Sequence, residues 1–226
     1  MSYPIKYPTP QGANIQIFNA GETKGTQTWV KPQGASFVWF TLIGAGASGD
    51  AANYGGGSGA VTNCMVPAFL IPDELQIQVG KGGVGVSQAI LVAGTNTLVN
   101  YSVNGSYNLL TANGGGSTGG AASTSNYFSC MGFYQSIAGQ TGSNASVNPS
   151  STTFLAGGGQ GSPTSNYGYI GITSPTDGFF QMQPIIVGMG GSGNFDNVKA
   201  GIGCGGAFGL NFGGAGGNGL VVIITW

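Results

Sequence analysis

The stretch FVWFTLIGAGASG, residues 37–49, decides the fold of this 226-residue chain. Residues 37–43 are aromatic, aliphatic or β-branched, which favours a β-strand, and the glycines from Gly44 onward end that strand. The same order recurs where Leu75, Ile77 and Val79 alternate with polar residues and so lie on one face of a strand before Gly80. The chain therefore alternates strands with glycine-rich connections.

Strand signals recur along the chain, whereas helical signals are almost missing. We find no twelve-residue window with helical spacing of apolar residues that is free of Gly and Pro. The sequence predicts an all-β fold, an antiparallel β-sandwich of jelly-roll-like type with long glycine-rich loops. The strands that we expect are residues 14–18, 37–43, 60–66, 75–79, 87–92, 97–103, 167–173, 183–187 and 220–226.

The glycine-rich connections form clusters of unusual length. In the last cluster, glycine stands at every third position in Gly203, Gly206 and Gly209, and the spacing resumes after a shift at Gly213. Such spacing suits extended left-handed threefold helices, in which a crowded side admits only glycine. A set of tight turns explains the composition about as well. The clusters are residues 44–59, 114–120, 157–161, 188–193 and 201–219.

The predicted organisation is one domain with an N-terminal extension. The run from Val221 to Ile224 is apolar at every position, so we expect a central strand that closes the sheet begun near Phe37. The expected parts are residues 1–27 as an N-terminal arm and first strand, 28–226 as a single glycine-rich β-sandwich domain, 104–218 within it as a loop-rich insertion, and 219–226 as the closing strand.

The composition argues against most enzymes and against nucleic-acid binding. The chain has six Asp or Glu residues, five Lys, no Arg and no His. Catalytic acids, bases and metal ligands come mainly from His, Cys and carboxylates, so we expect no enzyme, no cofactor and no metal. A net charge of -1 without Arg offers no basic surface to a phosphate backbone. The chain also lacks a membrane-spanning run and a signal peptide, so we expect no membrane insertion and synthesis in a cytoplasm.

Two motifs that could carry chemistry have simpler explanations. Cys64, Cys130 and Cys204 are odd in number and widely spaced, which favours buried thiols over a disulfide or a metal site. Residues Gly44 to Gly49 match GxGxxG, but a nucleotide site needs a helix directly after this motif and an acidic residue about twenty positions later. Residues 50–54 lead instead into another glycine cluster, so we expect no nucleotide binding.

Aromatic residues of the middle region are the candidate recognition residues. Tyr combined with Ser, Gly and Asn is typical of adaptable binding loops, in which rings supply contact area and small residues let the loop conform. The alternative is that these rings fill a loop-rich core, and the site would then lie in the loop from Gly44 to Gly59 or in the arm at residues 1–11. The candidates are Tyr127, Phe128, Phe133, Tyr134, Tyr167 and Tyr169.

Five motifs follow one another in a fixed order along the chain. They are residues 28–35 (TWVKPQGA), 38–46 (VWFTLIGAG), 55–60 (GGGSGA), 75–83 (LQIQVGKGG) and 213–224 (GGAGGNGLVVII). Together they resemble the glycine-rich domain found in virion proteins of tailed bacteriophages, often in tail fibres. Related glycine-rich proteins occur among the structural proteins of other large DNA viruses. The resemblance spans about residues 28–110 and 203–226 and implies a β-sandwich with glycine-rich loops in an oligomeric virion component, with no catalytic residues.

The expected function is that of a non-enzymatic structural protein of a virion, exposed as a fibre, spike or tail component that contributes to host attachment. One alternative is a capsid-decorating or minor capsid (cement) protein, and another is a free carbohydrate- or ice-binding module. The near-zero charge favours assembly. We therefore expect other virion proteins and a homo-oligomer, a trimer, as partners, with a host-surface glycan or protein as a further candidate. The expected location is the virion, after synthesis in the host cytoplasm.

Overall fold

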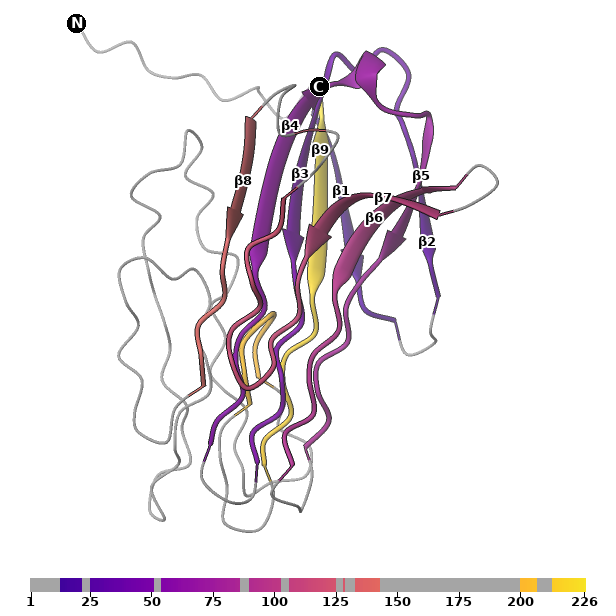
Figure 1. Cartoon of the computed structure of the whole chain (residues 1–226). Helices are drawn as coiled ribbons and strands as arrows, with labels where there is room; N and C mark the ends of the chain where they lie inside the picture. The colour runs from indigo at the N-terminus through magenta and orange to yellow at the C-terminus, as the bar shows by residue number, and fades with distance from the viewer. Residues whose placement is uncertain are drawn as a thin grey trace, which may run out of the picture.

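The described residues form two packed antiparallel β-sheets, which confirms the predicted all-β sandwich (Figure 1). Within them, the one helical element is a short 3-10 turn, η1 (Ala68–Leu70), and no helix is long and apolar enough to cross a membrane. The computed structural model describes residues 13–21, 25–50, 54–85, 90–102, 106–124, 128, 133–142, 200–206 and 213–226.

The two sheets have five and four strands, and all neighbouring strands are antiparallel. The larger sheet contains, in spatial order, β1 (Asn14–Asn19), β9 (Leu220–Thr225), β3 (Phe37–Ile43), β4 (Val61–Pro67) and β8 (Phe133–Ile137). The smaller sheet contains β2 (Gln27–Val30), β5 (Glu74–Gln78), β6 (Thr97–Ser102) and β7 (Ser106–Ala112).

The closing strand β9 has the central position that its apolar sequence predicts. It pairs on one side with β1 and on the other with β3, so that Ile223 lies between Gln16 and Phe40. All its residues except Ile224 are buried. A fully apolar strand is stable here because it has a strand on each side and is covered on both faces.

Most predicted strands are present, and the differences are local. β3 has the predicted bounds, and β1, β4, β5, β6 and β9 differ from prediction by one residue at one or both ends. The predicted strand at residues 87–92 is wrong over residues 90–92, which belong to no strand. The predicted strands at 167–173 and 183–187 lie outside the described residues. β2, β7 and β8 were not predicted, and the last two fall within residues 104–218, which we had expected to be rich in loops.

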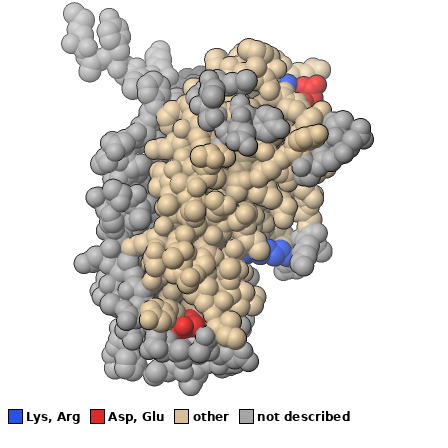
Figure 2. Space-filling view, in the orientation of Figure 1, with Lys and Arg blue, Asp and Glu red and all other residues tan. Residues whose placement is uncertain are grey.

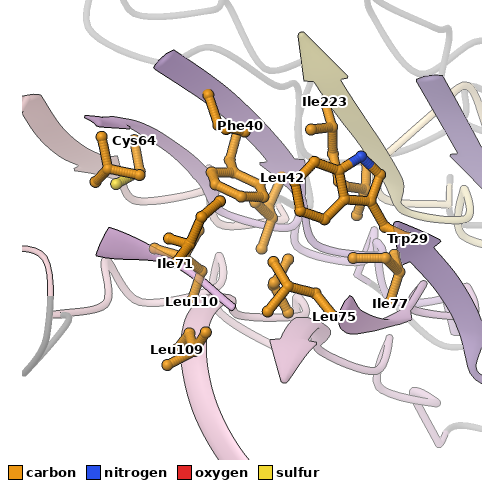
Figure 3. Close-up of a cluster of buried hydrophobic side chains, with 14 of the residues drawn as sticks. Trp29, Phe40, Leu42, Cys64, Ile71, Leu75, Ile77, Leu109, Leu110 and Ile223 are labelled. Atoms are coloured by element: carbon orange, nitrogen blue, oxygen red, sulfur yellow. The ribbon is translucent and has the colours of Figure 1, made fainter. Parts of the chain in front are cut away.

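The main hydrophobic core lies between the two sheets (Figure 3). Alternate residues of β3, among them Phe40, face this core, and the ring of Trp29 meets that of Phe40 edge to face at 6.1 Å. Leu75, Ile77 and Val79 are all buried in it, which confirms their predicted common face. Each such side chain contributes about 1.5–3 kcal/mol when it is fully buried, so this core is the main source of the sandwich's stability.

Below the sandwich, the strands continue into extended glycine-rich segments that run side by side (Figure 1). We call these segments the glycine bundle. For example, β3 continues into residues 44–50, and β4 is preceded by residues 54–60. The other segments of the glycine bundle are residues 79–85, 92–96, 113–120, 138–142, 200–206 and 213–219.

Hydrogen bonds along residues 44–50 have a period of three. Residues three apart donate to one neighbouring segment, and consecutive residues donate to different segments. A strand bonds to two neighbours in one plane, whereas a helix with three residues per turn points successive N–H groups in three directions. In order, the N–H groups of residues 44 to 49 donate at 2.8–3.3 Å to the carbonyl oxygens of Ala60, Thr95, Gly217, Gly57, Val92 and Gly214.

The same segment also accepts hydrogen bonds from three further segments. The carbonyl oxygens of its residues 45, 46 and 47 accept from the N–H groups of Gly115, Gly83 and Gly206, at 2.8–2.9 Å. Residues 44–50 are therefore enclosed by six described segments, and every one of them is buried. The spacing of the glycines reflects threefold extended helices rather than a set of tight turns.

Most described glycines of the bundle are needed because there is no room for a Cβ atom. A Cβ on Gly46 would press on the backbone carbonyl of Cys204, and one on Gly59 would press on that of Gly44. Only two described glycines have positive φ, Gly34 at 79° and Gly203 at 69°. In the rest of the bundle, close approach of backbones, rather than unusual dihedral angles, therefore requires glycine.

Candidate functional site

Asp50 and Tyr54 bond to each other at the end of the glycine bundle farthest from the sandwich. The N–H group of Asp50 donates to the carbonyl oxygen of Tyr54 at 2.9 Å, and the N–H group of Tyr54 donates to Asp50 Oδ1 at 2.8 Å. Asp50 is buried, whereas the Tyr54 side chain is 53% exposed.

Two further apolar side chains lie at the same end. Val84 lies near the end of the segment at residues 79–85, and Ile90 begins the next described segment; they are 65% and 60% exposed. Backbone contacts fix their level in the bundle, because Gly85 abuts Gly213, which in turn abuts Gly49. We call this end, marked by Asp50, Tyr54, Val84 and Ile90, the bundle tip.

Four connections between described segments begin and end at or near the bundle tip. Residues 51–53, 86–89 and 207–212 each join two described segments there. Residues 143–199 follow Gly142, which abuts Gly55, and precede Ala200, which donates to the carbonyl oxygen of Ala215. The topology thus brings to one end of the molecule connections that are far apart in the sequence.

The described surface carries few charged side chains. Figure 2 shows a face on which Lys, Arg, Asp and Glu occupy only small areas. Across the described chain, no three His, Cys, Asp or Glu side chains gather as a metal site would require. The bundle tip can offer apolar contact, a tyrosine hydroxyl and backbone groups.

Three of the six predicted recognition residues are described, and they lie in or against the sandwich. Phe128 is only 4% exposed and belongs to the main core. Phe133 is half-buried, and its ring stacks on that of Trp39 at 5.6 Å. Tyr127, Tyr167 and Tyr169 lie outside the described residues, so their role stays a prediction.

Tyr134 is half-buried and bonds within the molecule. Its hydroxyl donates to the carbonyl oxygen of Ser123 at 2.8 Å and lies 3.1 Å from the Ser123 hydroxyl. The Ser123 N–H group donates to Ser136 Oγ at 2.9 Å, and both serine hydroxyls lie near that of Thr62. The Tyr134 hydroxyl therefore helps to attach residues 121–124 to β8 and β4.

The predicted recognition residues do not include Tyr54, Val84 or Ile90. Tyr54 lies within the loop from Gly44 to Gly59 that we named as the alternative site, but Val84 and Ile90 look like ordinary strand residues in sequence. The signal that could have found them is topological. Each lies near the point where one glycine-rich segment ends and the next runs back. Such points lie at the same end of the molecule when the segments pack side by side.

The described cysteines are buried thiols, as predicted. Cys64 belongs to the main core, Cys204 lies in a second apolar cluster below the larger sheet, and neither is in a disulfide. Burial raises the pKa of the Cys64 thiol from 9.0 to about 12 because the thiolate would lose its hydration. Such a thiol is inert at neutral pH. Cys130 lies outside the described residues.

A separate cavity of about 400 Å³ lies where the sandwich meets the bundle. Residues with amide, hydroxyl and ammonium groups line it, together with the apolar residues Ala20 and Val79. This volume suits a small ligand, and the mixed lining suits a polar one. The polar side chains at the cavity are Thr26, Gln27, Gln78, Lys81 and Thr95.

A family model described as a glycine-rich domain matches residues 22–226. The match includes eight of the nine strands and the whole described bundle, while β1 lies before it. No curated protein matches the chain.

Proposed function

We propose that this chain, which belongs to the glycine-rich domain family, is a non-enzymatic structural protein of a virus particle. The support for the virus particle is the resemblance of its sequence motifs to the glycine-rich domains of phage virion proteins. In this proposal it is an exposed fibre, spike or tail component whose bundle tip contributes to host attachment. It resides in the particle after synthesis in the host cytoplasm. Its partners are other particle proteins, further copies of itself and a host-surface glycan or protein.

The observation that carries the proposal is the convergence of connections on the bundle tip. Recognition residues are commonly found on loops that a rigid scaffold holds in place. The bundle supplies such a scaffold, because its central segment bonds to six neighbours and most of its glycines lie directly against a neighbouring backbone. Its tip exposes Tyr54, Val84 and Ile90, which supply contact area without charge.

Binding to host cells tests the role of the bundle tip. We expect Tyr54→Ser and Ile90→Ser to weaken binding of the purified protein to host cells by about tenfold or more, as loss of an interface anchor does. Phe69→Ser is the matched control, because Phe69 is 82% exposed on η1, which lies at the end of the sandwich away from the bundle (Figure 1). Circular dichroism should show that all three variants keep the parent fold.

Three outcomes would contradict the proposal. If the tip variants bind cells as the parent does, the tip is not the recognition surface. If the protein binds naked capsids but not cells, it is a capsid-decorating or minor capsid protein. If immunogold microscopy with antibodies to the chain labels no virus particle, the protein is not a virion component. Faceted growth of ice crystals in its presence would then favour an ice-binding module.

The cavity at Lys81 favours a second candidate, a carbohydrate-binding module. Sugars are bound by side-chain amides and hydroxyls over apolar surface, and the cavity combines these groups. Gln78→Ala should then abolish binding on a glycan array, while Tyr54→Ser should leave it unchanged. The opposite result would place glycan binding at the bundle tip and remove this candidate.

A further inference from the structure

Among the described strands, β1 forms one edge of the larger sheet and pairs with β9 alone. On its other side, the Gln27 side-chain amide donates to the Asn19 carbonyl oxygen at 2.9 Å, at the end of the strand. No backbone group of the described residues hydrogen-bonds to this side of β1. Half of the N–H and C=O groups of an edge strand point away from its neighbour, so they are available to another strand.

This edge lacks the features that usually prevent strands from pairing between molecules. Natural edge strands are protected by Lys, Pro, a β-bulge or very short length. β1 has six residues, with neither charge nor proline, and its pairing with β9 is regular. Ile15 and Ile17 are each 60% exposed.

The two isoleucines extend an apolar surface of the sheet to its edge. Ile15 lies opposite Ile224 of β9, and Ile17 lies opposite Val222. Opposed residues of antiparallel strands point to the same face, so these four side chains share the outer face of the larger sheet. On this face Val222 of β9 is buried and Ile224 is partly buried, so the apolar side chains become exposed to solvent only at β1, at Ile15 and Ile17.

We propose that β1 pairs with β1 of a second copy of this chain, antiparallel and centred on Gln16. Each Gln16 then faces its counterpart, and Ile15 of one copy faces Ile17 of the other. The two larger sheets become one continuous sheet across a twofold axis. The unpaired backbone groups of both edges are satisfied, and the two apolar surfaces merge.

The alternation of side chains selects this register. In a continuous sheet the outer faces of the two copies lie on the same side. Each outer-face residue of one β1 must therefore lie opposite an outer-face residue of the other β1. A register with Ile15 opposite Ile15 leaves Ile17 against Ala13, and one with Ile17 opposite Ile17 leaves Ile15 against Asn19. Only the register centred on Gln16 pairs all four isoleucines with one another.

Charge and symmetry agree with a second copy as the occupant. Residues 13–21 contain no charged side chain, so two copies of this edge do not repel each other. A twofold contact uses the same surface on both copies and closes as a dimer, so this proposal predicts a dimer where the sequence analysis predicted a trimer. The inference is independent of the proposed function, and β1 lies outside the residues that match the family.

Sedimentation equilibrium tests the contact. The parent protein should have twice the mass of the chain, and Ile17→Lys should weaken the dimer by at least tenfold, because two lysines would then enter the contact. Val30→Lys is the matched control, since Val30 is 61% exposed on β2, an edge strand of the other sheet. A monomeric or trimeric parent overturns the proposal, as does a dimer that Ile17→Lys leaves intact.

Cysteine cross-linking tests the register without a change of charge. Directly opposed residues have Cα atoms about 4.5–5.5 Å apart, which suits a disulfide. Gln16→Cys should therefore cross-link two chains on mild oxidation, whereas Asn19→Cys should not, since residue 19 would oppose residue 13. The parent, with its own three cysteines, gives the background. Cross-linking of Asn19→Cys, or none with Gln16→Cys, overturns the register.

Discussion

The glycines of the bundle stabilise it because they lack a Cβ atom, which allows neighbouring backbones to lie close together. Where a Cβ atom would stand, Gly46 faces the carbonyl carbon and oxygen of Cys204, which belong to a neighbouring backbone and have no freedom to rotate away. Protein interiors are packed as densely as organic crystals, so even one added methyl group disturbs the packing. The backbone pairing of the bundle therefore depends on individual glycines.

Gly46→Ala should destabilise the protein by at least the ~1–3 kcal/mol typical of overpacked cores. Gly116→Ala is the control, because the nearest atom to a Cβ there is Thr118 O at 4.0 Å. We expect the control to change the free energy of unfolding by less than about 0.5 kcal/mol. Urea denaturation measures both, and equal effects would mean that the bundle has room that its backbone contacts do not show.

Burial of the Cys64 thiol makes stability depend on alkaline pH. With its pKa at about 12 in the folded protein, this thiol stays protonated between pH 9 and 12, while the thiol of the unfolded chain ionises. Ionisation thus favours unfolding, by about 1 kcal/mol per pH unit in this window, and has no effect below pH 9. The free energy of unfolding should therefore fall less between pH 8 and pH 10.5 in Cys64→Val than in the parent, as urea denaturation at the two pH values can measure. An equal loss in parent and variant would contradict it.

At the scale of elements, strands and bundle segments form one continuous set of extended chains. β3 runs into residues 44–50 without a turn, and only the hydrogen-bond pattern changes, from two neighbours in a sheet to neighbours on all sides. This continuity explains why the strand predicted over residues 87–92 is wrong at residues 90–92. Ile90 to Val92 is extended and apolar as a strand would be, but Val92 O accepts from Ser48 in the bundle.

The strands that sequence pattern could predict are those with a clean apolar face. β3 and β5 carry such patterns, so their faces and their bounds, to within one residue, were predictable. β7 was missed because Tyr107 and Asn108 interrupt its pattern. The pairing of β6 with β7 also shifts at Val99 and Asn100, and such an irregularity depends on the partner strand rather than on local sequence.

Ile223→Ala tests the closing position of β9. Ile223 is fully buried between two paired strands, so its truncation should cost about 2–5 kcal/mol. Val30→Ala is the control, because Val30 is exposed on β2 and should cost about 0.5 kcal/mol or less. Thermal melting with circular dichroism would separate the two, and a parent-like melting temperature for Ile223→Ala would make β9 a peripheral strand.

At the scale of the whole molecule, the position of a candidate site depends on packing that local sequence does not encode. Tyr134 has the small polar neighbours of a binding-loop residue, yet its hydroxyl bonds to Ser123 and its strand pairs with β4. Tyr54 has similar neighbours and is exposed, because its segment ends at the bundle tip. What separates them is the direction of each chain through the bundle, which follows from contacts between residues up to about 170 positions apart, such as Gly46 and Gly217.

Because the strands pass from sandwich to bundle without a break, we expect the two parts to unfold together. Trp29 and Trp39 lie in the sandwich, and Trp29 is fully buried in the main core, so tryptophan fluorescence follows the sandwich while far-ultraviolet circular dichroism follows the backbone of both parts. The two signals should give one coincident transition, as in two-state unfolding. Gly46→Ala, which changes only the bundle, should lower the fluorescence midpoint by as much as the dichroism midpoint. A fluorescence midpoint unmoved by Gly46→Ala would show that the sandwich folds independently and that the bundle is an appendage supported by it.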